Sequence, residues 1–231
     1  MKKSLIIFLL PVLYSSQVMT EMEVFNNSNG NVFNVKNTKF NSYEGIDGSP
    51  YINQLFLPIK IDGYNKLLPM LRYNAYEDEM EFKIENNLSY VQKIGEMKIT
   101  FIANNKSYVL KNYNIDGDSK SGYLVELVTE RNKFALYKKE FIQILEYNNN
   151  TTNTYLKQKN PYFERAKDIL ILSYGENYIK FPKSANDLTL WIENKTTFAK
   201  SSDVQNFIKK NKINFKKETD LISLVTFMNS L

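Results

Sequence analysis

Four carboxylates lie close together in the sequence, at Glu77, Asp78, Glu79 and Glu81. Such a group could bind a cation. Two of its members could also act as an acid–base pair on a glycosidic bond, which needs carboxyl groups about 5–9 Å apart on opposite sides of the substrate. Adjacent carboxylates in one exposed turn are more often solvated, because water stabilises their charges. We therefore predict a solvated acidic turn and assign no catalytic residue.

Arg72 raises a second chemical question, because it lies within an apolar strand pattern and a charge there needs a partner. Glu79 or Glu81, across a predicted hairpin, would supply a cross-strand ion pair. The alternative partner is an anionic group of a ligand. The sequence thus predicts a ligand- or partner-binding patch on this hairpin, formed by Arg72, Tyr73, Tyr76, Glu79 and Glu81.

Tyr73, Tyr76, Tyr108 and Tyr137 have two interpretations. They could line a groove for a hydrophobic or carbohydrate ligand on the solvent side of a curled sheet. They could equally pack in the core or across strands, and packing is the interpretation that we favour.

The segment IDGDSKSG, residues 115–122, resembles the beginning of a calcium-binding loop, with Asp116, Asp118 and Ser119 as possible oxygen ligands. Lys120 occupies a position where another oxygen ligand belongs, and the bidentate glutamate is missing from its expected place. We predict an ordinary loop at Asp116–Gly122 and no metal site.

The composition excludes several kinds of chemistry. The chain has no Cys and no His, which excludes a Cys/His zinc site, a thiol nucleophile and a Ser-His-Asp triad. The formal net charge is +5, and only three of the 30 cationic residues are Arg, the residue that reads phosphates and base edges bidentately. We expect no nucleic-acid binding and no cofactor.

A group of lysines in the C-terminal part could contact an anionic membrane surface or lipopolysaccharide. Glu218 and Asp220 dilute this charge, and lysine is common on solvated helix faces. We predict at most a weak contact with an anionic surface. The lysines are Lys209, Lys210, Lys212, Lys216 and Lys217.

These candidate residues depend on the hairpin predicted over Lys66–Glu85. Leu71, Tyr73 and Ala75 alternate before the acidic turn, and Met80 and Phe82 alternate after it, as in strands with one solvated face. Similar alternation continues as far as residue 181. The strands expected by this pattern are residues 31–36, 55–61, 97–101, 107–113, 123–128, 134–138, 141–145, 169–174 and 178–181.

The pattern changes to helical spacing after Pro182. Ser184 with Asp187, and Ser202 with Gln205, have the spacing of helix N-caps. Trp191, Phe207 and Phe227 are the expected anchors of three helices, at residues 185–193, from 202 and at 218–229. The predicted fold class is α+β, an antiparallel β-meander of roughly eight to ten strands in a curled or half-barrel sheet, followed by about three short C-terminal helices.

Residues 1–20 have the pattern of a secretory signal peptide, with Lys2 and Lys3 before the short apolar run Ser4–Tyr14. No Cys follows, which excludes a lipoprotein anchor, and no later segment is apolar enough for a membrane helix. We expect a periplasmic or extracellular protein, with an antiparallel β domain at 21–182 and a helical segment at 183–231 packed on the sheet.

Three stretches resemble a family of exported proteins from Bacteroidota. They are Gly48–Tyr51 (GSPY), Leu71–Phe82 (LRYNAYEDEMEF) and the tail Asp203–Asn229 with its FIKKNKI and KKETDLISLV segments. The resemblance implies a β-rich exported protein with a helical tail. It implies no activity and no functional residues.

Three functional hypotheses follow from the sequence. The first is a non-enzymatic envelope protein that binds another protein or an envelope component. The second is a carrier of a lipid or another apolar ligand in a curled-sheet cavity, and the third is a carboxylate-dependent hydrolase of envelope polymers.

Overall fold

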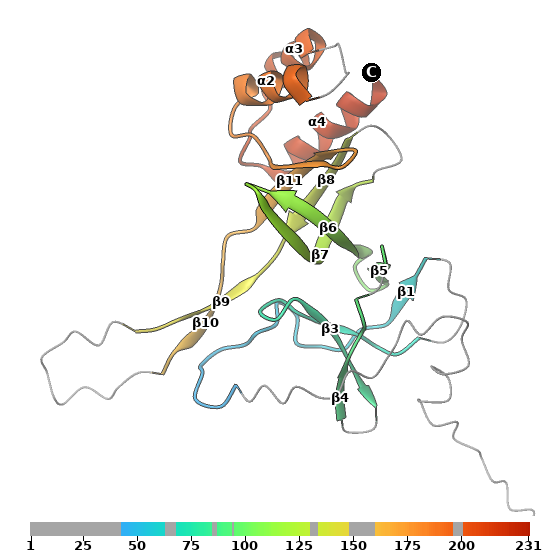
Figure 1. Ribbon diagram of the computed structural model, residues 1–231, viewed down its shortest axis with the longest axis vertical. Coiled ribbons are helices and arrows are strands. Elements are labelled where there is room, and N and C mark those ends of the chain that lie inside the picture. Colours follow the sequence, from blue (N-terminus) through green and yellow to red (C-terminus); the bar gives the residue numbers. More distant parts are fainter. Residues whose placement is uncertain are drawn as a thin grey trace, which may run out of the picture.

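The computed structural model describes residues 43–62, 68–84, 87–93, 95–129, 134–147, 160–195 and 201–231. It confirms the α+β class, because antiparallel strands form most of the body and three short helices follow at the C-terminus. Figure 1 shows the helices at one end of an elongated molecule, the large sheet in the middle and a small sheet at the other end. The predicted signal peptide and the predicted strand at 31–36 lie outside the described residues.

The main sheet has seven strands, and each hydrogen-bonded pair of neighbours in it is antiparallel. Its order is β1-β5-β6-β7-β8-β11-β12, so it is an open sheet with β1 and β12 at its edges. The strands are β1 (Ile59–Ile61), β5 (Lys98–Phe101), β6 (Lys106–Ile115), β7 (Asp118–Val128), β8 (Phe134–Lys139), β11 (Ile169–Tyr174) and β12 (Asn177–Lys180).

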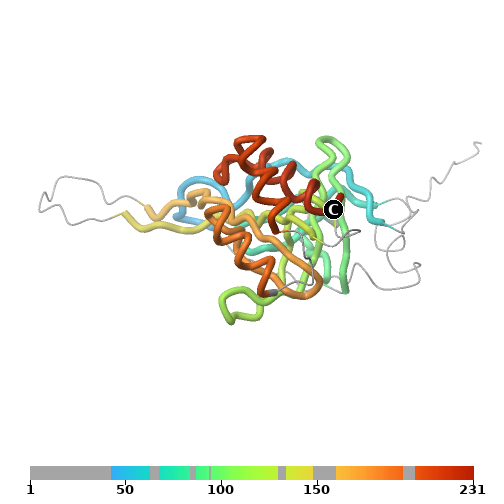
Figure 2. Tube along the Cα trace, turned by 90° about the horizontal axis from the view of Figure 1, so that it is seen from above, coloured from blue at the N-terminus to red at the C-terminus, as the bar shows by residue number. Residues whose placement is uncertain are grey.

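Two smaller sheets interrupt the expected meander. One contains β2 (Arg72–Asn74), β3 (Glu79–Ile84) and β4 (Asn87–Tyr90), and the other pairs β9 (Ile142–Leu145) with β10 (Tyr162–Arg165). Figure 2 shows the β9–β10 pair leaving the side of the body as an arm. Neither β4 nor β10 was predicted as a strand from the sequence.

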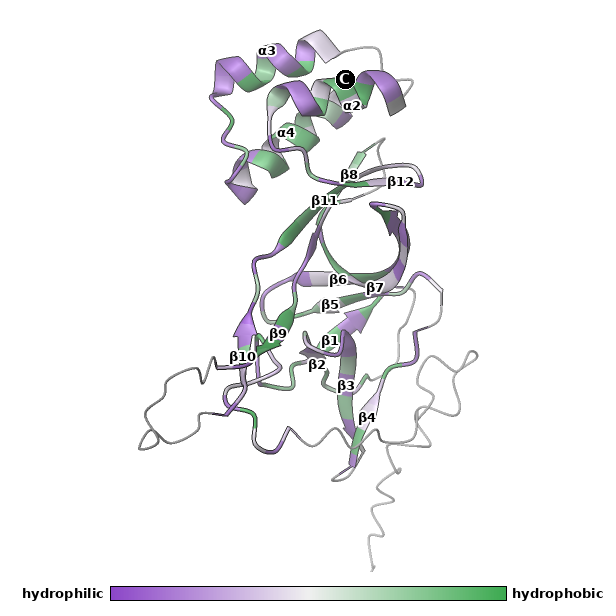
Figure 3. Ribbon diagram, turned by 60° about the vertical axis from the view of Figure 1, so that its left-hand side comes forward, coloured by the Kyte–Doolittle hydropathy of each residue, from purple (hydrophilic) through white to green (hydrophobic). Residues whose placement is uncertain are grey.

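The hairpin predicted over Lys66–Glu85 forms from β2 and β3, but the face expected to be solvated is partly buried, because Asn74 and Glu81 on it are fully buried. Leu71 and Tyr73 before the turn, and Met80 and Phe82 after it, are all buried, and Tyr73 pairs with Met80 across the strands. Figure 3 shows the resulting alternation of hydrophobic and hydrophilic residues along β3. Asp78 in the turn has φ = 57°, a left-handed conformation that Asp tolerates better than most residues.

Two expected boundaries are wrong. Of the strand predicted at residues 55–61 only β1 forms a strand of the main sheet, because Leu57 pairs instead with Leu71; Leu55 is exposed. The predicted loop at Asp116–Gly122 is a tight turn at Asp116–Gly117 followed directly by β7. Its Gly, Ser and Asp content favours a loop locally, but pairing with β6 from Ile115↔Asp118 onward overrides that preference.

The three helices are α2 (Ala185–Lys195), α3 (Ser201–Asn211) and α4 (Glu218–Ser230). The predicted cap of α2 is present, because the Asp187 N–H donates to Ser184 Oγ at 3.2 Å. The predicted cap at Ser202 is not, since Ser202 lies inside α3. None of the described helices is long and apolar enough to cross a bilayer.

Aliphatic side chains, more than the expected aromatic anchors, hold the helices on the sheet. Trp191, Phe207 and Phe227 are only partly buried, and the rings of Phe207 and Phe227 stack 4.0 Å apart. In addition, the side chain of Asn229 in α4 exchanges two 2.8 Å hydrogen bonds with the Phe134 backbone in β8. The fully buried residues include Leu188, Ile192, Val204, Leu221, Leu224, Val225 and Met228, which pack against Phe134, Leu136 and Leu172.

Candidate functional site

Arg72 in β2 forms the predicted cross-strand ion pair with Glu81 in β3. The two residues are direct partners in the register, and Arg72 Nη2 lies 2.7 Å from Glu81 Oε2. The Arg72 guanidinium carbon also lies 3.5 Å from the centre of the Tyr51 ring and 4.4 Å from that of Phe56. The guanidinium is therefore held between two aromatic rings and a carboxylate.

The second oxygen of Glu81 is also used within the protein. Asn74 Nδ2 donates to Glu81 Oε1 at 2.8 Å and to the Tyr43 hydroxyl at 2.9 Å. Both Asn74 and Glu81 are fully buried. Burial above all, together with the nearby charges of Glu77 and Glu81, raises the pKa of Tyr43 to about 12 despite the Asn74 hydrogen bond. This network attaches the chain segment 43–56 to the hairpin.

The other three residues of the predicted patch point to different places. Tyr73 is buried, and its ring centre lies 4.7 Å from that of Tyr108. Tyr76 is 39% exposed and packs edge-on against Tyr43. Glu79 is partly exposed, and its carboxylate lies 3.4 Å from Lys93 Nζ. The five residues thus share one hairpin without surrounding one cavity, and their role in binding stays a prediction.

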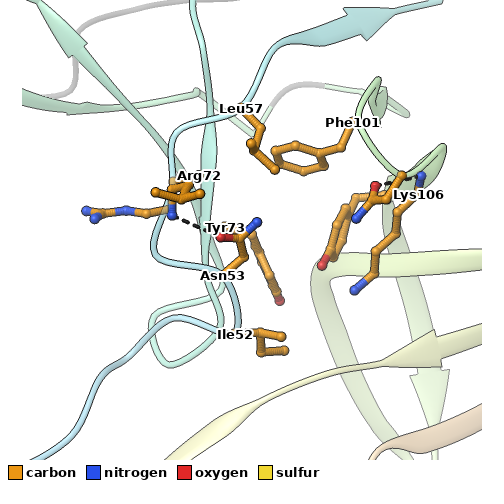
Figure 4. A pocket seen from close by; sticks show the side chains of 10 residues that line it. Ile52, Asn53, Leu57, Arg72, Tyr73, Phe101 and Lys106 are labelled. Atoms are coloured by element: carbon orange, nitrogen blue, oxygen red, sulfur yellow. Dashed lines mark hydrogen bonds between the residues drawn. The ribbon is translucent and has the colours of Figure 1, made fainter.

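Arg72 and Tyr73 do border a small cavity of about 100 Å³, which Figure 4 shows from close by. Tyr73 and Lys106 project towards it, whereas the Arg72 guanidinium points away. Its volume is well below the ~300 Å³ at which ligand pockets usually begin. Of the four tyrosines considered for a groove, Tyr73, Tyr108 and Tyr137 are buried in packing, which is the interpretation that the sequence analysis favoured.

The acidic turn is not simply solvated, because Asp78 reaches from the small sheet onto the main sheet. Its carboxylate lies 2.6 Å from Lys139 Nζ, accepts a 2.6 Å hydrogen bond from the Tyr73 hydroxyl and receives the Tyr123 N–H at 3.3 Å. Gly122 leaves room for it, since a Cβ there would lie 2.1 Å from Asp78 Oδ2. We call this arrangement of Asp78, Tyr73, Gly122, Tyr123 and Lys139 the Asp78 latch.

The Asp78 latch has an unusual lysine. Burial lowers the pKa of Lys139, and the neighbouring Asp78 carboxylate opposes that change. Lys139 Nζ also donates to the Tyr123 carbonyl at 3.1 Å. Local sequence patterns could not reveal this contact, because Asp78 in the β2–β3 turn and Lys139 in β8 are about 60 residues apart in the chain and meet only in the folded protein.

A second buried carboxylate, Glu140, lies where β8 leaves the main sheet. Its oxygens accept hydrogen bonds from Lys106 Nζ at 2.6 Å, from the Tyr108 hydroxyl at 2.8 Å and from Arg165 at 3.3 Å. Burial opposes its ionisation, but the hydrogen bonds from Lys106 and Tyr108 and the charges of Lys106 and Lys138 outweigh burial and lower the pKa of Glu140. Glu140 therefore connects β6, β8 and β10.

The residues considered for calcium binding do not converge. Asp116 has φ = 57° in the β6–β7 turn and lies 2.6 Å from Lys180 Nζ, whereas Asp118 and Ser119 begin β7. In the described parts of the chain, no three acidic side chains are grouped closely enough to hold a metal ion. The five C-terminal lysines considered for surface contact are all exposed.

A wider hollow lies where the β6–β7 hairpin approaches the β11–β12 turn. It has a volume of about 660 Å³. The Tyr178 ring centre lies 5.9 Å from that of Tyr113 and 6.3 Å from that of Tyr137. We call this hollow the β6–β12 groove; its lining consists of Glu96, Asn112, Tyr113, Asn114, Ser119, Lys120, Ser121, Glu176 and Tyr178.

Below the groove the curled sheet is filled by its own side chains. Leu124, Ala135 and Ile171 pack there with Tyr113 and Tyr137 as one buried cluster. The groove was not predictable from the sequence, because its lining combines residues of the predicted loop at Asp116–Gly122 with residues about 60 positions later in the chain.

No protein-family model matches the chain, and neither the curated proteins nor the solved structures contain a match. The resemblance to exported proteins of Bacteroidota therefore stays a prediction.

Proposed function

We propose that this chain is an exported, non-enzymatic binding protein of the bacterial cell envelope, and that it holds its ligand in the β6–β12 groove. The observation that carries the proposal is the groove itself. Its volume of about 660 Å³ lies within the ~300–1,000 Å³ typical of ligand sites. Most of its lining residues are exposed polar residues that two neighbouring hairpins present.

The use of charged groups elsewhere supports a binding role over a catalytic one. A catalytic carboxylate must reach a substrate, yet Glu81 is paired with Arg72, and Glu140 with Lys106 and Arg165. Asp78 is similarly engaged by Lys139. These pairs connect strands and sheets, so they stabilise the scaffold that presents the groove.

Export rests on the sequence. Lys2 and Lys3 followed by the apolar run Ser4–Tyr14 have the pattern of a leader that directs a protein out of the cytoplasm. An envelope protein of this kind would bind either another envelope protein or an envelope component.

The apolar carrier is a weaker candidate, because the exposed charged residues Lys120 and Glu176 line the groove. An apolar ligand would take these charges out of water at a cost in free energy. The hydrolase hypothesis has one supporting observation, which is that Glu96 and Glu176 line the same groove. Glu96, however, already pairs with Lys111 at 3.1 Å.

The test is an affinity pull-down of the tagged full-length chain from its own envelope fraction, followed by mass spectrometry of proteins, lipids and glycans. Lys120→Ala alters the groove, because Lys120 pairs with Tyr113 and shares its face of the sheet, and Lys60→Ala is the matched control, because Lys60 is an exposed strand residue outside the groove. We expect one component that Lys60→Ala retains and Lys120→Ala loses. Capture that is equal for both variants would contradict the proposed site, and turnover of the captured component would contradict the non-enzymatic role.

A further inference from the structure

We infer that the solvent-facing side of the β9–β10 arm is a docking surface for a cationic segment of a partner protein. The arm leaves the side of the body (Figure 2). This surface is separate from the β6–β12 groove, because none of its residues lines the groove. We call it the arm face; it consists of Asp47, Leu145, Tyr147, Tyr162 and Glu164.

The strand register places these five side chains on one side of the arm. Leu145 pairs with Tyr162 across β9 and β10, and Asp47 pairs with Tyr162 along the other edge of β10. These three side chains therefore form one cross-strand row. Glu164 follows Tyr162 by two residues, which brings its side chain to the same side. Tyr147 lies there too, since its ring centre is 4.6 Å from that of Tyr162.

The opposite side of the arm is covered by the body of the protein. Ile142 and Phe163 are buried in one core cluster, and Ile144, the register partner of Phe163, packs against that cluster. A two-stranded ribbon alone is at best marginally stable in water, and it gains stability when its apolar side chains are covered. The core covers one side of this ribbon, and a partner on the arm face would cover the other.

The arm face presents aromatic surface to such a partner. Tyr147 is 39% exposed, and Tyr162 and Leu145 beside it are only partly buried. The two tyrosine rings pack against each other, so they lose little side-chain entropy when a partner binds. Tyrosine is enriched among the residues that dominate the energy of protein interfaces, and the face of its ring attracts Lys and Arg side chains.

Two carboxylates determine the sign of the charge on the arm face. Asp47 and Glu164 are exposed, and neither forms an ion pair within the part of the chain that the structure describes. Asp47 accepts a hydrogen bond from the Asn160 amide at 3.3 Å. Glu164 accepts one from the Gln143 amide at 3.4 Å. A neutral amide orients a carboxylate without cancelling its charge, so the complementary partner is cationic.

The spacing of the two carboxylates suits an extended segment. Asp47 stands beside Tyr162, and Glu164 lies two residues further along β10, which is about 6.6 Å. Side chains at every second position of an extended peptide have the same spacing. A segment with lysine at alternate positions would therefore bring one ammonium group to each carboxylate, with the apolar lysine stems on the tyrosine rings.

The experiment measures the fluorescence anisotropy of labelled peptides titrated with the full-length chain. The probe is an eight-residue peptide that alternates lysine and threonine, and its matched peptide alternates glutamate and threonine. We expect the lysine peptide to bind and the glutamate peptide not to bind. Added salt should weaken the binding, because it screens exposed charges.

Substitutions then locate the binding on the arm face. Tyr147→Ala should weaken it about tenfold, whereas Tyr147→Phe should retain it, because the ring face makes the contact. Asp47→Asn should weaken it about threefold, as expected for the loss of one exposed ion pair. Glu176→Gln is the matched control, because it removes an exposed carboxylate that lines the β6–β12 groove, and it should leave binding unchanged. Circular dichroism will verify that each variant folds.

Three results would overturn the inference. The first is no binding of the lysine peptide at millimolar concentration, and the second is equal binding of both peptides. The third is an equal effect of Asp47→Asn and Glu176→Gln, which would mean that general charge attraction acts without the arm face. The groove has its own test, because Lys120→Ala leaves every residue of the arm face in place.

Discussion

The Asp78 latch makes one substitution, Gly122→Ala, sharply informative. An alanine Cβ at this position would lie 2.1 Å from Asp78 Oδ2 and 3.3 Å from Lys139 Nζ. Contacts below 3 Å do not persist, so the Asp78 carboxylate must move. When it moves it loses its ion pair with Lys139 and its hydrogen bond from the Tyr73 hydroxyl, both 2.6 Å long.

The magnitude follows from what is left behind. Removing one partner of a buried ion pair costs about 3–5 kcal/mol. The Asp78 and Lys139 side chains keep 21% and 16% of their accessible surface, so the low end of that range applies. Replacing Gly by Ala within a strand normally gains about 0.5–1 kcal/mol. We therefore expect Gly122→Ala to lower the free energy of unfolding by about 2 kcal/mol, opposite in sign to the usual effect.

The assay is urea unfolding followed by circular dichroism, in which the midpoint should fall while the slope m stays constant. In a heat-unfolding scan the same loss corresponds to a Tm lower by about 4–8 °C.

The control is the same substitution in an Asp78→Gly background. Glycine accepts the φ of 57° at position 78 and removes the carboxylate with which the new Cβ would collide. Gly122→Ala should then be neutral or stabilising. If Gly122→Ala alone is as stable as the wild type, or if its cost is the same in the Asp78→Gly background, the latch does not work as we describe.

Three further predictions concern ionisable groups. Burial raises the pKa values of Tyr43 and Tyr113 to about 12, so stability that is complete below pH 10 should be lost as pH rises through 12, and tyrosinate absorbance should appear together with unfolding. The pKa of Glu140 is lowered in the folded protein, so its contribution to the free energy of unfolding is complete above its ordinary pKa of 4.5 and is lost as pH falls through the lower folded pKa. In urea unfolding at a series of acidic pH values, Glu140→Gln should make the stability less dependent on pH. Arg72→Met should cost about 3 kcal/mol, because it leaves the Glu81 carboxylate buried without its cation, and adding Glu81→Gln should recover part of that loss.

The spacing of apolar and polar residues was enough to predict the features that depend on residues close together in the sequence. The alternation around Leu71 and Met80 correctly predicted a hairpin and its apolar face, because period-2 burial of apolar residues needs no knowledge of distant residues. It did not predict that Asn74 and Glu81 on the other face are buried too. Ser184 and Asp187 likewise marked the beginning of α2. The Arg72–Glu81 pair was predictable for the same reason, since the two residues face each other across one tight turn.

Contacts between sheets could not be predicted in this way. The single meander expected from the sequence is divided into three sheets, and they are joined by side chains such as Asp78 and Glu140, whose partners are distant in the chain. β4 and β10 were not predicted, and each is held as a strand by pairing with a neighbour, β4 with β3 and β10 with β9. The first part of β7, before Tyr123, was predicted as a loop because its Gly and Ser residues resemble one until β6 pairs with them.

The Asp78 latch and the β6–β12 groove both use strand β7, so a change in stability at the latch can also affect binding in the groove. Ser121 lines the groove, and the next two residues, Gly122 and Tyr123, receive the Asp78 carboxylate. The Asp78 charge also contributes, after burial, to the raised pKa of Tyr113 in the groove. The small sheet thus fixes β7 at the point where the groove begins, so a change in the latch would move groove residues as well. Binding must therefore be tested with Lys120, and the latch with Gly122, so that a loss of affinity is not mistaken for a loss of fold.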